Sequence, residues 1–324
     1  FRVSGVPGVS RMERPRRDRS AGEGLRITPG GQSIRPEARE GRMSMDSALL
    51  KELQVRALAV RRDILGMLKT SNLGSLRSSF SAVELLVWLY GAILSLRPEA
   101  PTEAGRDRFV LSRVSAAPAL YAVLAGYGFF GRDELWSYGR LGSLLQTTPE
   151  CRRSPGVDVS CGALGMGVGI ALGLALSLGD GRPIPNVLCL LGAEELEAGS
   201  TGEALARAVV QPPSNLTLIV ECAIVGCAEG EALSRRPARI AERLAALGCT
   251  VVCADGHDYA SLQGAWSSLS GDRLRVILAR TVHGKGLPDG KGLPGLRERA
   301  WDDADTLDPQ VTEHLIRGLE DTPS

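Results

Sequence analysis

Charged side chains lie in three stretches of this 324-residue sequence where they could bind an anion or a metal ion. Glu194 and Glu195 follow the apolar run NVLCLLG, and carboxylate oxygens are ligands that divalent cations prefer. Arg113 follows the run RFVLS, and Arg77 lies in the loop NLGSLRSS, which is rich in small residues. A guanidinium group can bind a carboxylate or a phosphate through two parallel hydrogen bonds. The two arginines are therefore candidate contacts for a small anionic ligand.

Histidine, the usual proton-transfer group near neutral pH, occurs three times. His257 lies in DGHD, where we expect a hydrogen bond within a turn. His283 lies in TVHGKG and is interpreted either as a loop residue or as a group that faces the ligand site. His314 is expected on the surface of a C-terminal helix. Few candidates for acid–base catalysis are therefore available.

The elements that would position these groups alternate along the chain. Short apolar runs predict strands over 106–112, 186–192, 215–222, 249–256 and 275–281. Helices are predicted over 47–69, 81–94 (with Ser81 as N-cap), 116–128, 163–178, 199–210, 236–247 and 258–269. This order predicts an α/β fold with a doubly wound, mainly parallel sheet and helices on both faces. Ligands of such sheets bind at the carboxyl ends of the strands, here Ser112, Gly192, Cys222, Gly256 and Thr281.

The composition argues against several classes of function. The net charge is +1, so nothing in the overall charge favours nucleic acid or an acidic membrane surface. Residues 161–179 are uncharged over roughly the length of a membrane span. Their many glycines and the lack of a basic flank favour a helix buried in the centre of a soluble domain instead.

The seven cysteines are an odd number without a CxxC pair, and most lie in apolar runs. We expect them to be reduced and buried in a cytoplasmic protein, with disulfides as the alternative. Residues 1–43 are rich in Arg, Gly, Pro and Ser and are predicted to be a disordered extension. Residues 44–324 are predicted to form the α/β domain.

Eight motifs in order give the chain a specific resemblance. They are RRDILGML, RDRFVLS with SAAPALYAVL, LGSLLQ, PGVDVSCGALGMGVGIALGLAL, LLGAEELEAGSTGEA, NLTLIVE, DGHD and TVHGKG. From about residue 48 to residue 318, the chain resembles the amino-terminal, diphosphate-binding half of the transketolases, in the split-subunit form found in bacteria. The resemblance implies a thiamine diphosphate-binding fold of the PP type, with thiamine diphosphate and Mg²⁺ as cofactors. It also implies transfer of a two-carbon ketol unit between sugar phosphates.

The positions that carry the chemistry of this family depart from its pattern. Ser75, Ser115 and Thr148 stand where the resemblance implies histidines, and Ala193 and Ala223 stand where it implies metal ligands. An acid that links paired active sites in the family falls on Ala198, although Glu203 nearby is kept. The remaining cofactor positions would form a degenerate site at Gly74, Cys161, Leu164, Gly165, Met166, Gly192, Glu194, Glu195 and His283.

These substitutions predict loss of the family's chemistry. Alanine offers no side-chain oxygen to a metal ion, and Glu194 adds negative charge where a diphosphate would pass. Like charges about 5 Å apart at an effective dielectric constant of about 20 repel by roughly 3 kcal/mol. Serine and threonine cannot replace histidine as a base without an activating group. In one rescue, Glu194 or Glu195 would itself bind the metal, which leaves a single protein ligand.

Three functions follow as hypotheses. The first is a non-catalytic structural or regulatory subunit without tightly bound cofactor, in a homo-oligomer or with a complementary carboxyl-terminal-type transketolase subunit. The second is an active split transketolase subunit with thiamine diphosphate at a heteromeric interface. The third is a repurposed pocket in which Arg77 and Arg113 bind a small anionic ligand.

Overall fold

The computed structural model describes residues 46–179, 184–224 and 236–287. These residues form a five-stranded sheet in the order β1-β2-β3-β5-β4, and every strand pair is parallel. The strands are β1 (Arg108–Leu111), β2 (Val187–Gly192), β3 (Leu216–Ile224), β4 (Thr250–Asp255) and β5 (Arg275–Val282). The predicted strands and the α/β fold class are confirmed. The predictions for residues 1–43, Cys227 and His314 lie outside the described residues, so the boundary at residue 44 stays a prediction.

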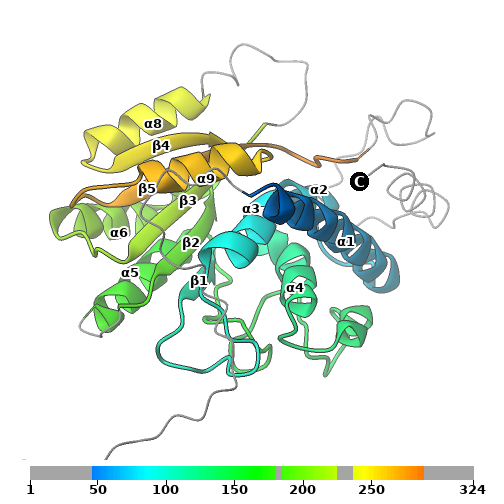
Figure 1. Ribbon diagram of the computed structural model, residues 1–324. Coiled ribbons are helices and arrows are strands. Elements are labelled where there is room, and N and C mark those ends of the chain that lie inside the picture. Colours follow the sequence, from blue (N-terminus) through cyan, green and yellow to red (C-terminus); the bar gives the residue numbers. More distant parts are fainter. Residues whose placement is uncertain (1–45, 180–183, 225–235, 288–324) are drawn as a thin grey trace, which may run out of the picture. The chain divides into compact units, whose positions relative to one another are not determined.

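Helices cover both faces of the sheet (Figure 1). On one face lie α1 (Ser47–Ser71), α2 (Leu76–Ser81), α3 (Val83–Trp88), α4 (Ala117–Gly126) and α9 (Tyr259–Ser268). On the other lie α5 (Met166–Leu178), α6 (Gly199–Val210) and α8 (Arg236–Ala246). Successive strand residues point to opposite faces, so Leu188 and Leu190 of β2 join the first core while Cys189 and Leu191 join the second.

The helix predicted over 81–94 starts earlier than the sequence pattern indicated. α2 begins at Leu76, because the hydroxyl of Ser75 accepts a hydrogen bond from the N–H of Ser78 at 3.3 Å. Ser81 is not an N-cap: it lies in the last turn of α2 and donates to the carbonyl of Ser78 at 3.0 Å. After α3 the chain continues as a π-helical turn, Leu89–Ile93.

Two burial predictions need correction. α5 is not buried on all sides, since Met166 and Leu176 on its outer face are 48% and 42% exposed. Cys151 and Cys253 are exposed, whereas Cys161, Cys189, Cys222 and Cys249 are buried, and no disulfide joins these six described cysteines to one another. Cys253 is exposed because β4 is an edge strand of the sheet. None of the described helices is long and apolar enough to cross a membrane.

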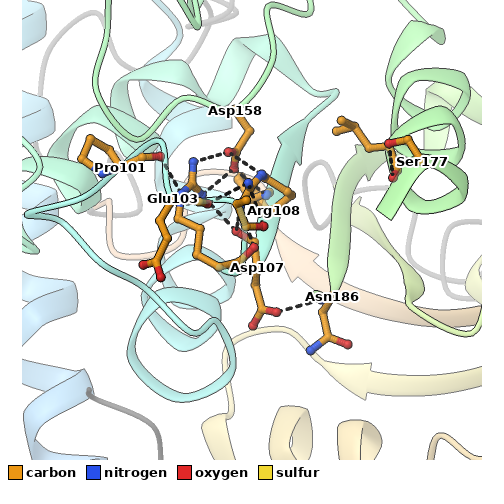
Figure 2. A network of polar contacts seen from close by, with 11 residues as sticks. Pro101, Glu103, Asp107, Arg108, Asp158, Ser177 and Asn186 are labelled. Carbon is orange, nitrogen blue, oxygen red and sulfur yellow. Dashed lines mark hydrogen bonds and ion pairs between the residues drawn. The ribbon is translucent and has the colours of Figure 1, made fainter. Parts of the chain in front are cut away.

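A polar network fixes the amino end of β1 (Figure 2). Asp158 accepts a hydrogen bond from the N–H of Phe109 at 2.8 Å. It also forms an ion pair with Arg106, and the side chains of both residues are buried. Asp107 accepts from the N–H groups of Ser95 and Asn186 at 2.8 and 2.7 Å. Because β1 is an edge strand, Asp158 satisfies an outward N–H that no neighbouring strand can reach. The network therefore anchors the segment that leads from Asp158 towards α5.

Candidate functional site

Glu195 is a buried acid at the carboxyl ends of the strands. It lies in η4 (Ala193–Glu197), the 3₁₀ turn directly after β2, and is 1% exposed. Its Oε1 accepts from the N–H of Gly192 at 2.9 Å, and its Oε2 accepts from the N–H of Gly165 at 3.1 Å and from the hydroxyl of Ser112. Both carboxylate oxygens therefore already have donors from this chain. Glu195 joins the ends of β1 and β2 to the start of α5.

Glycine is required where α5 begins. Gly165 has φ +81°, and a Cβ there would lie 2.5 Å from Cβ of Ala198. A Cβ on Gly167 would lie 2.2 Å from Cβ of Ser112. These contacts place the first turn of α5 directly against the ends of β1 and of the turn after β2. The backbone N–H of Gly165 thereby reaches Glu195.

Arg113 forms a second buried network across the ends of β1, β3 and β5. Arg113 is 7% exposed. Its Nη1 forms an ion pair with Oε2 of Glu221 and lies 3.3 Å from Oγ of Ser81. Thr281, at the end of β5, donates to Oε1 of Glu221 at 3.0 Å. Nε of Arg113 lies 3.7 Å from Oε1 of Glu194. The guanidinium is thus surrounded by groups of this chain.

The electrostatics of Arg113 follow from these contacts. Burial alone would lower the pKa of its guanidinium, but the carboxylates of Glu221, Glu194 and Glu195 outweigh that effect and raise the pKa. The ion pair with Glu221 is therefore a stable feature of the folded chain. An incoming anion would have to compete with Glu221, whose carboxylate is fully buried.

Glu194 lies over Gly192, at the start of the turn after β2. Its side chain is 54% exposed, and its Oε1 lies 2.2 Å from the position that a Cβ on Gly192 would occupy. The carboxylate therefore folds back over Gly192 and towards Arg113. Negative charge at this point opposes the binding of a phosphate group there.

The two alanines predicted at metal-ligand positions lie at the same edge of the sheet. Ala193 is 5% exposed, and Ala223 of β3 pairs with Thr281 of β5. Neither methyl group can bind a metal ion. In the described ranges, no three His, Cys, Asp or Glu side chains are grouped so that they could hold one. The residues present here do not fit a magnesium ion with a bound diphosphate.

The loop before α2 and the segment after β5 form the other side of the site. Gly74 has φ +100°, and Ser75 caps α2. The carbonyl of Arg77 accepts from the N–H of Gly284 at 3.2 Å, which brings this segment against α2. His283 is half-buried in the same segment. The structure thus places the segment that contains His283 against α2, which contains Arg77.

The remaining predicted positions surround this centre. Ser115 is exposed, and Cγ2 of Thr148 lies 3.2 Å from where a Cβ on Gly162 would be. Leu164, an apolar residue just before the start of α5, is 64% exposed. Burial and the charge of Glu195 raise the pKa of the Cys161 thiol, so this buried cysteine stays protonated at neutral pH.

Sequence reasoning missed the charged partners that fill the site. Glu221 is an acid at the end of an apolar strand, and Arg61 and Glu84 lie on largely apolar helices. Such isolated charges inside apolar runs were an available signal, since buried charges are normally paired. The hydrogen bond expected within the turn is made by the backbone N–H of His257, which donates to Asp255 at 2.9 Å. The imidazole ring instead contacts Glu84 of α3, outside the turn, at 2.9 Å.

Comparisons with known proteins agree with this fold. Residues 54–306 match the family model of the transketolase thiamine diphosphate-binding domain. The transketolase of Pongo abelii is 31% identical over 284 residues, which cover 86% of this chain and 44% of that protein. One subunit of the apulose-4-phosphate transketolase of Phocaeicola vulgatus is 26% identical over 249 residues, which cover 75% of this chain and 87% of that subunit. A solved transketolase from Campylobacter jejuni has a TM-score of 0.65 at 26% identity and covers 76% of this chain.

These matches define a class of protein with a thiamine diphosphate-binding fold. The chain belongs to the transketolase family and corresponds to its amino-terminal, diphosphate-binding domain. It spans somewhat less than half of the length of full transketolases such as the Pongo abelii protein, but most of the length of the Phocaeicola vulgatus subunit.

Proposed function

We propose that this chain is a transketolase-family subunit that has lost thiamine diphosphate and Mg²⁺ binding and has a non-catalytic, structural or regulatory role. Its partner would be a second copy of the chain or a complementary carboxyl-terminal-type subunit. The likeness to the Phocaeicola vulgatus protein supports the second arrangement, since that protein is named as one subunit of a transketolase.

One observation carries the proposal: acids and methyl groups of this chain fill the edge where the family cofactor would bind. Ala193 and Ala223 supply no ligand, and Glu195 uses both oxygens within the fold. Glu194 lies over Gly192. In the metal rescue by Glu195, a metal ion would have to bind a carboxylate that already accepts hydrogen bonds from two buried backbone N–H groups and a buried hydroxyl.

The alternative, an active transketolase subunit, is favoured by one relative that is named as a subunit of an apulose-4-phosphate transketolase. In that case the chain would hold thiamine diphosphate together with a complementary subunit and transfer a ketol unit between sugar phosphates. A partner could add groups at the interface. It could not easily replace Ala193 and Ala223, because these residues belong to the sheet and turn of this chain.

The repurposed-pocket alternative depends on Arg77 and Arg113. Arg113 is paired with Glu221, so only Arg77 is a candidate for a new ligand without loss of an internal ion pair. A small anion would then bind between α2 and the segment after β5. This hypothesis predicts that Arg77→Ala abolishes binding of a sugar phosphate, whereas Arg152→Ala on an exposed loop leaves it unchanged.

Isothermal titration calorimetry of the full chain with thiamine diphosphate and Mg²⁺ tests the proposal. The titration is run with the chain alone and with a complementary carboxyl-terminal-type subunit, and a catalytically competent split transketolase is the positive control. We expect no saturable heat at cofactor concentrations up to about 1 mM, which corresponds to a binding free energy weaker than roughly −4 kcal/mol. Micromolar, metal-dependent binding would support the active alternative instead.

A further inference from the structure

An exposed apolar surface runs along α5 and α6, the helices before and after β2 in the sequence. Met166 and Leu176 of α5 are exposed, and α5 contains no charged residue. Val210, at the end of α6, is 80% exposed. The solvent face of a surface helix normally carries charged residues, so an uncharged face is typical of a surface that packs against another molecule. The exposed residues of these two helices are called the α5–α6 face below.

The two helices lie side by side (Figure 1). Oγ of Ser200 donates to the carbonyl of Gly165 at 3.1 Å, and a Cβ on Gly169 would lie 3.9 Å from Cβ of Ala204. Both contacts join residues that are the same number of positions apart in the sequence. The helices therefore run parallel, and Leu176 comes level with the end of α6. The exposed apolar residues of both helices thus share one surface.

Only two residues of α5 and α6 are charged, and they have opposite signs. Glu203 and Arg207 of α6 are both exposed and stand four positions apart. Arg207 donates a hydrogen bond to Gln211 at 3.0 Å. Within the described part of the chain, Glu203 has no ion-pair partner, although the spacing to Arg207 would allow a pair within the helix. Each charge is therefore available to a partner of opposite sign on another molecule.

This arrangement is complementary to itself. In a two-fold contact, residue i of one copy faces residue j of the other, and j faces i. When α6 packs antiparallel against α6 of a second copy, with the axis midway between Glu203 and Arg207, each acid faces the arginine of the other copy. The same packing sets Val210 level with Gly199 and Ser200 of the second copy. These small residues leave room for the exposed apolar side chain.

We propose that two copies of this chain form a two-fold dimer through the α5–α6 face, with Glu203 of each copy paired to Arg207 of the other. Charge complementarity favours a second copy as the occupant, because an apolar partner would leave both charges unpaired. The inference rests on the homo-oligomeric arrangement within the proposed function and names its surface. It does not depend on the loss of cofactor binding.

Sedimentation velocity of the full chain tests this interface. Between about 1 and 100 μM, the parent chain should pass from monomer to dimer. Arg207→Glu and Glu203→Arg should each raise the dissociation constant of the dimer roughly tenfold or more, because like charges then meet at the axis. Arg152→Glu, on an exposed loop outside α5 and α6, is the control and should dimerise like the parent chain.

A mixture of the two single variants separates the interface from an effect on α6 itself. Each variant places like charges four residues apart in its own helix, and this repulsion remains after mixing. Across the interface, however, the two arginines of one variant meet the two glutamates of the other. Glu203→Arg and Arg207→Glu should therefore associate with each other about as strongly as the parent chain does with itself. The double variant should also regain the dimer, and circular dichroism checks that every variant is folded.

Each failure has its own reading. A parent chain that stays monomeric at about 100 μM would overturn the proposal and leave the α5–α6 face to a complementary subunit. A dimer that ignores the single substitutions, or a mixture that does not associate, would place the contact on another surface and overturn it too. The calorimetric titration with thiamine diphosphate and Mg²⁺ is independent of these results. A dimer that binds the cofactor tightly would contradict the proposed function alone, and a monomer that does not bind it would contradict the dimer alone.

Discussion

Glu195 and Glu221 are buried carboxylates whose partners all come from this chain. Glu195 receives two backbone N–H groups and a hydroxyl, and Glu221 receives Arg113 and Thr281. In each case the charge stays buried because its partners hold it, and the same pairing removes the group from the pool of possible ligands. At the residue scale, both carboxylates are therefore bonded within the fold of this chain.

Replacing Glu195 with glutamine should destabilise the fold strongly. The amide NH₂ group would face at least one of the donors from Gly165, Gly192 and Ser112, and a buried donor would be left without an acceptor. We expect a loss of about 3 kcal/mol in the free energy of unfolding, measured by urea denaturation. Glu197→Gln, two residues further on and exposed, is the matched control and should change it by less than about 0.5 kcal/mol. Equal effects of the two changes would contradict the role assigned to Glu195.

Glu84 should make stability depend on acid. Burial alone would raise its pKa, but the hydrogen bond from His257 and the charge of Arg61 outweigh this and hold the pKa below its ordinary value of 4.5. The unfolded chain therefore takes up the proton at higher pH than the folded chain. The stability contributed by Glu84 is full above about pH 4.5 and is lost as the pH falls through the lower folded pKa.

The measurement compares unfolding free energies of the parent chain and Glu84→Gln across this pH range. At neutral pH the parent should be more stable by about 3 kcal/mol, because the variant leaves Arg61 buried without its carboxylate. The difference should shrink as the pH falls below about 4.5. Glu52→Gln, which removes an exposed pair with Arg56, should show almost no difference at any pH. A constant gap between the parent and Glu84→Gln would argue against the assigned linkage.

At the scale of elements, the short helix α2 shows where local pattern and structure diverge. Ser75 and Ser81 are equally good N-cap residues by type. The apolar residues after Ser81 follow a helical spacing more regularly than those after Ser75. The structure uses Ser75, because the chain from Ser75 onward must pack against α4 and the segment after β5. The choice depends on contacts that are distant in sequence, so the local pattern could not decide it.

Substituting Ser75 by alanine should weaken α2. The hydroxyl of Ser75 satisfies the N–H of Ser78, which the helix itself cannot bond. A loss of about 1 kcal/mol in unfolding free energy is expected, measured by chemical denaturation. Ser115→Ala, another serine at a family histidine position but exposed, is the control and should have little effect. If both substitutions cost the same, the capping role of Ser75 would be wrong.

The strands of the sheet were predictable from sequence, and the pairing of its charges was not. Uninterrupted apolar runs such as 186–192 are enough to locate buried parallel strands and their carboxyl ends. The pair between Arg113 and Glu221 depends on β1 and β3 flanking β2, with both side chains at the same edge. Sequence reasoning could assign each residue to a strand end. It could not tell which of several acids there would bind the arginine, since that depends on side-chain direction.

At the scale of the whole molecule, the chain keeps the scaffold of its family, and the proposed loss of cofactor binding concerns one edge of the sheet. The described sheet and helices match transketolases over most of the chain at about a quarter to a third identity. Close approaches such as Gly165 to Ala198 are still in place. The proposed loss of cofactor binding depends on a small number of these side chains, so it can be tested by changing them.

The triple variant Ala193→Asp, Glu194→Gly, Ala223→Asn should regain cofactor binding if these positions account for the loss. A ligand at a hundred times its dissociation constant adds about 2.7 kcal/mol to stability, which raises the midpoint of thermal unfolding by roughly 5–10 °C for a domain of this size. With thiamine diphosphate and Mg²⁺ together, we expect such a rise in the triple variant and none in the parent chain. The rise should disappear when Mg²⁺ is replaced by a chelator, because the restored oxygens act through the metal.

A shift of the parent chain equal to that of the variant would mean that Glu194, Ala193 and Ala223 do not prevent binding. A folded variant with no shift would place the obstacle elsewhere, in the buried pairs of Arg113 and Glu195 that this variant leaves intact.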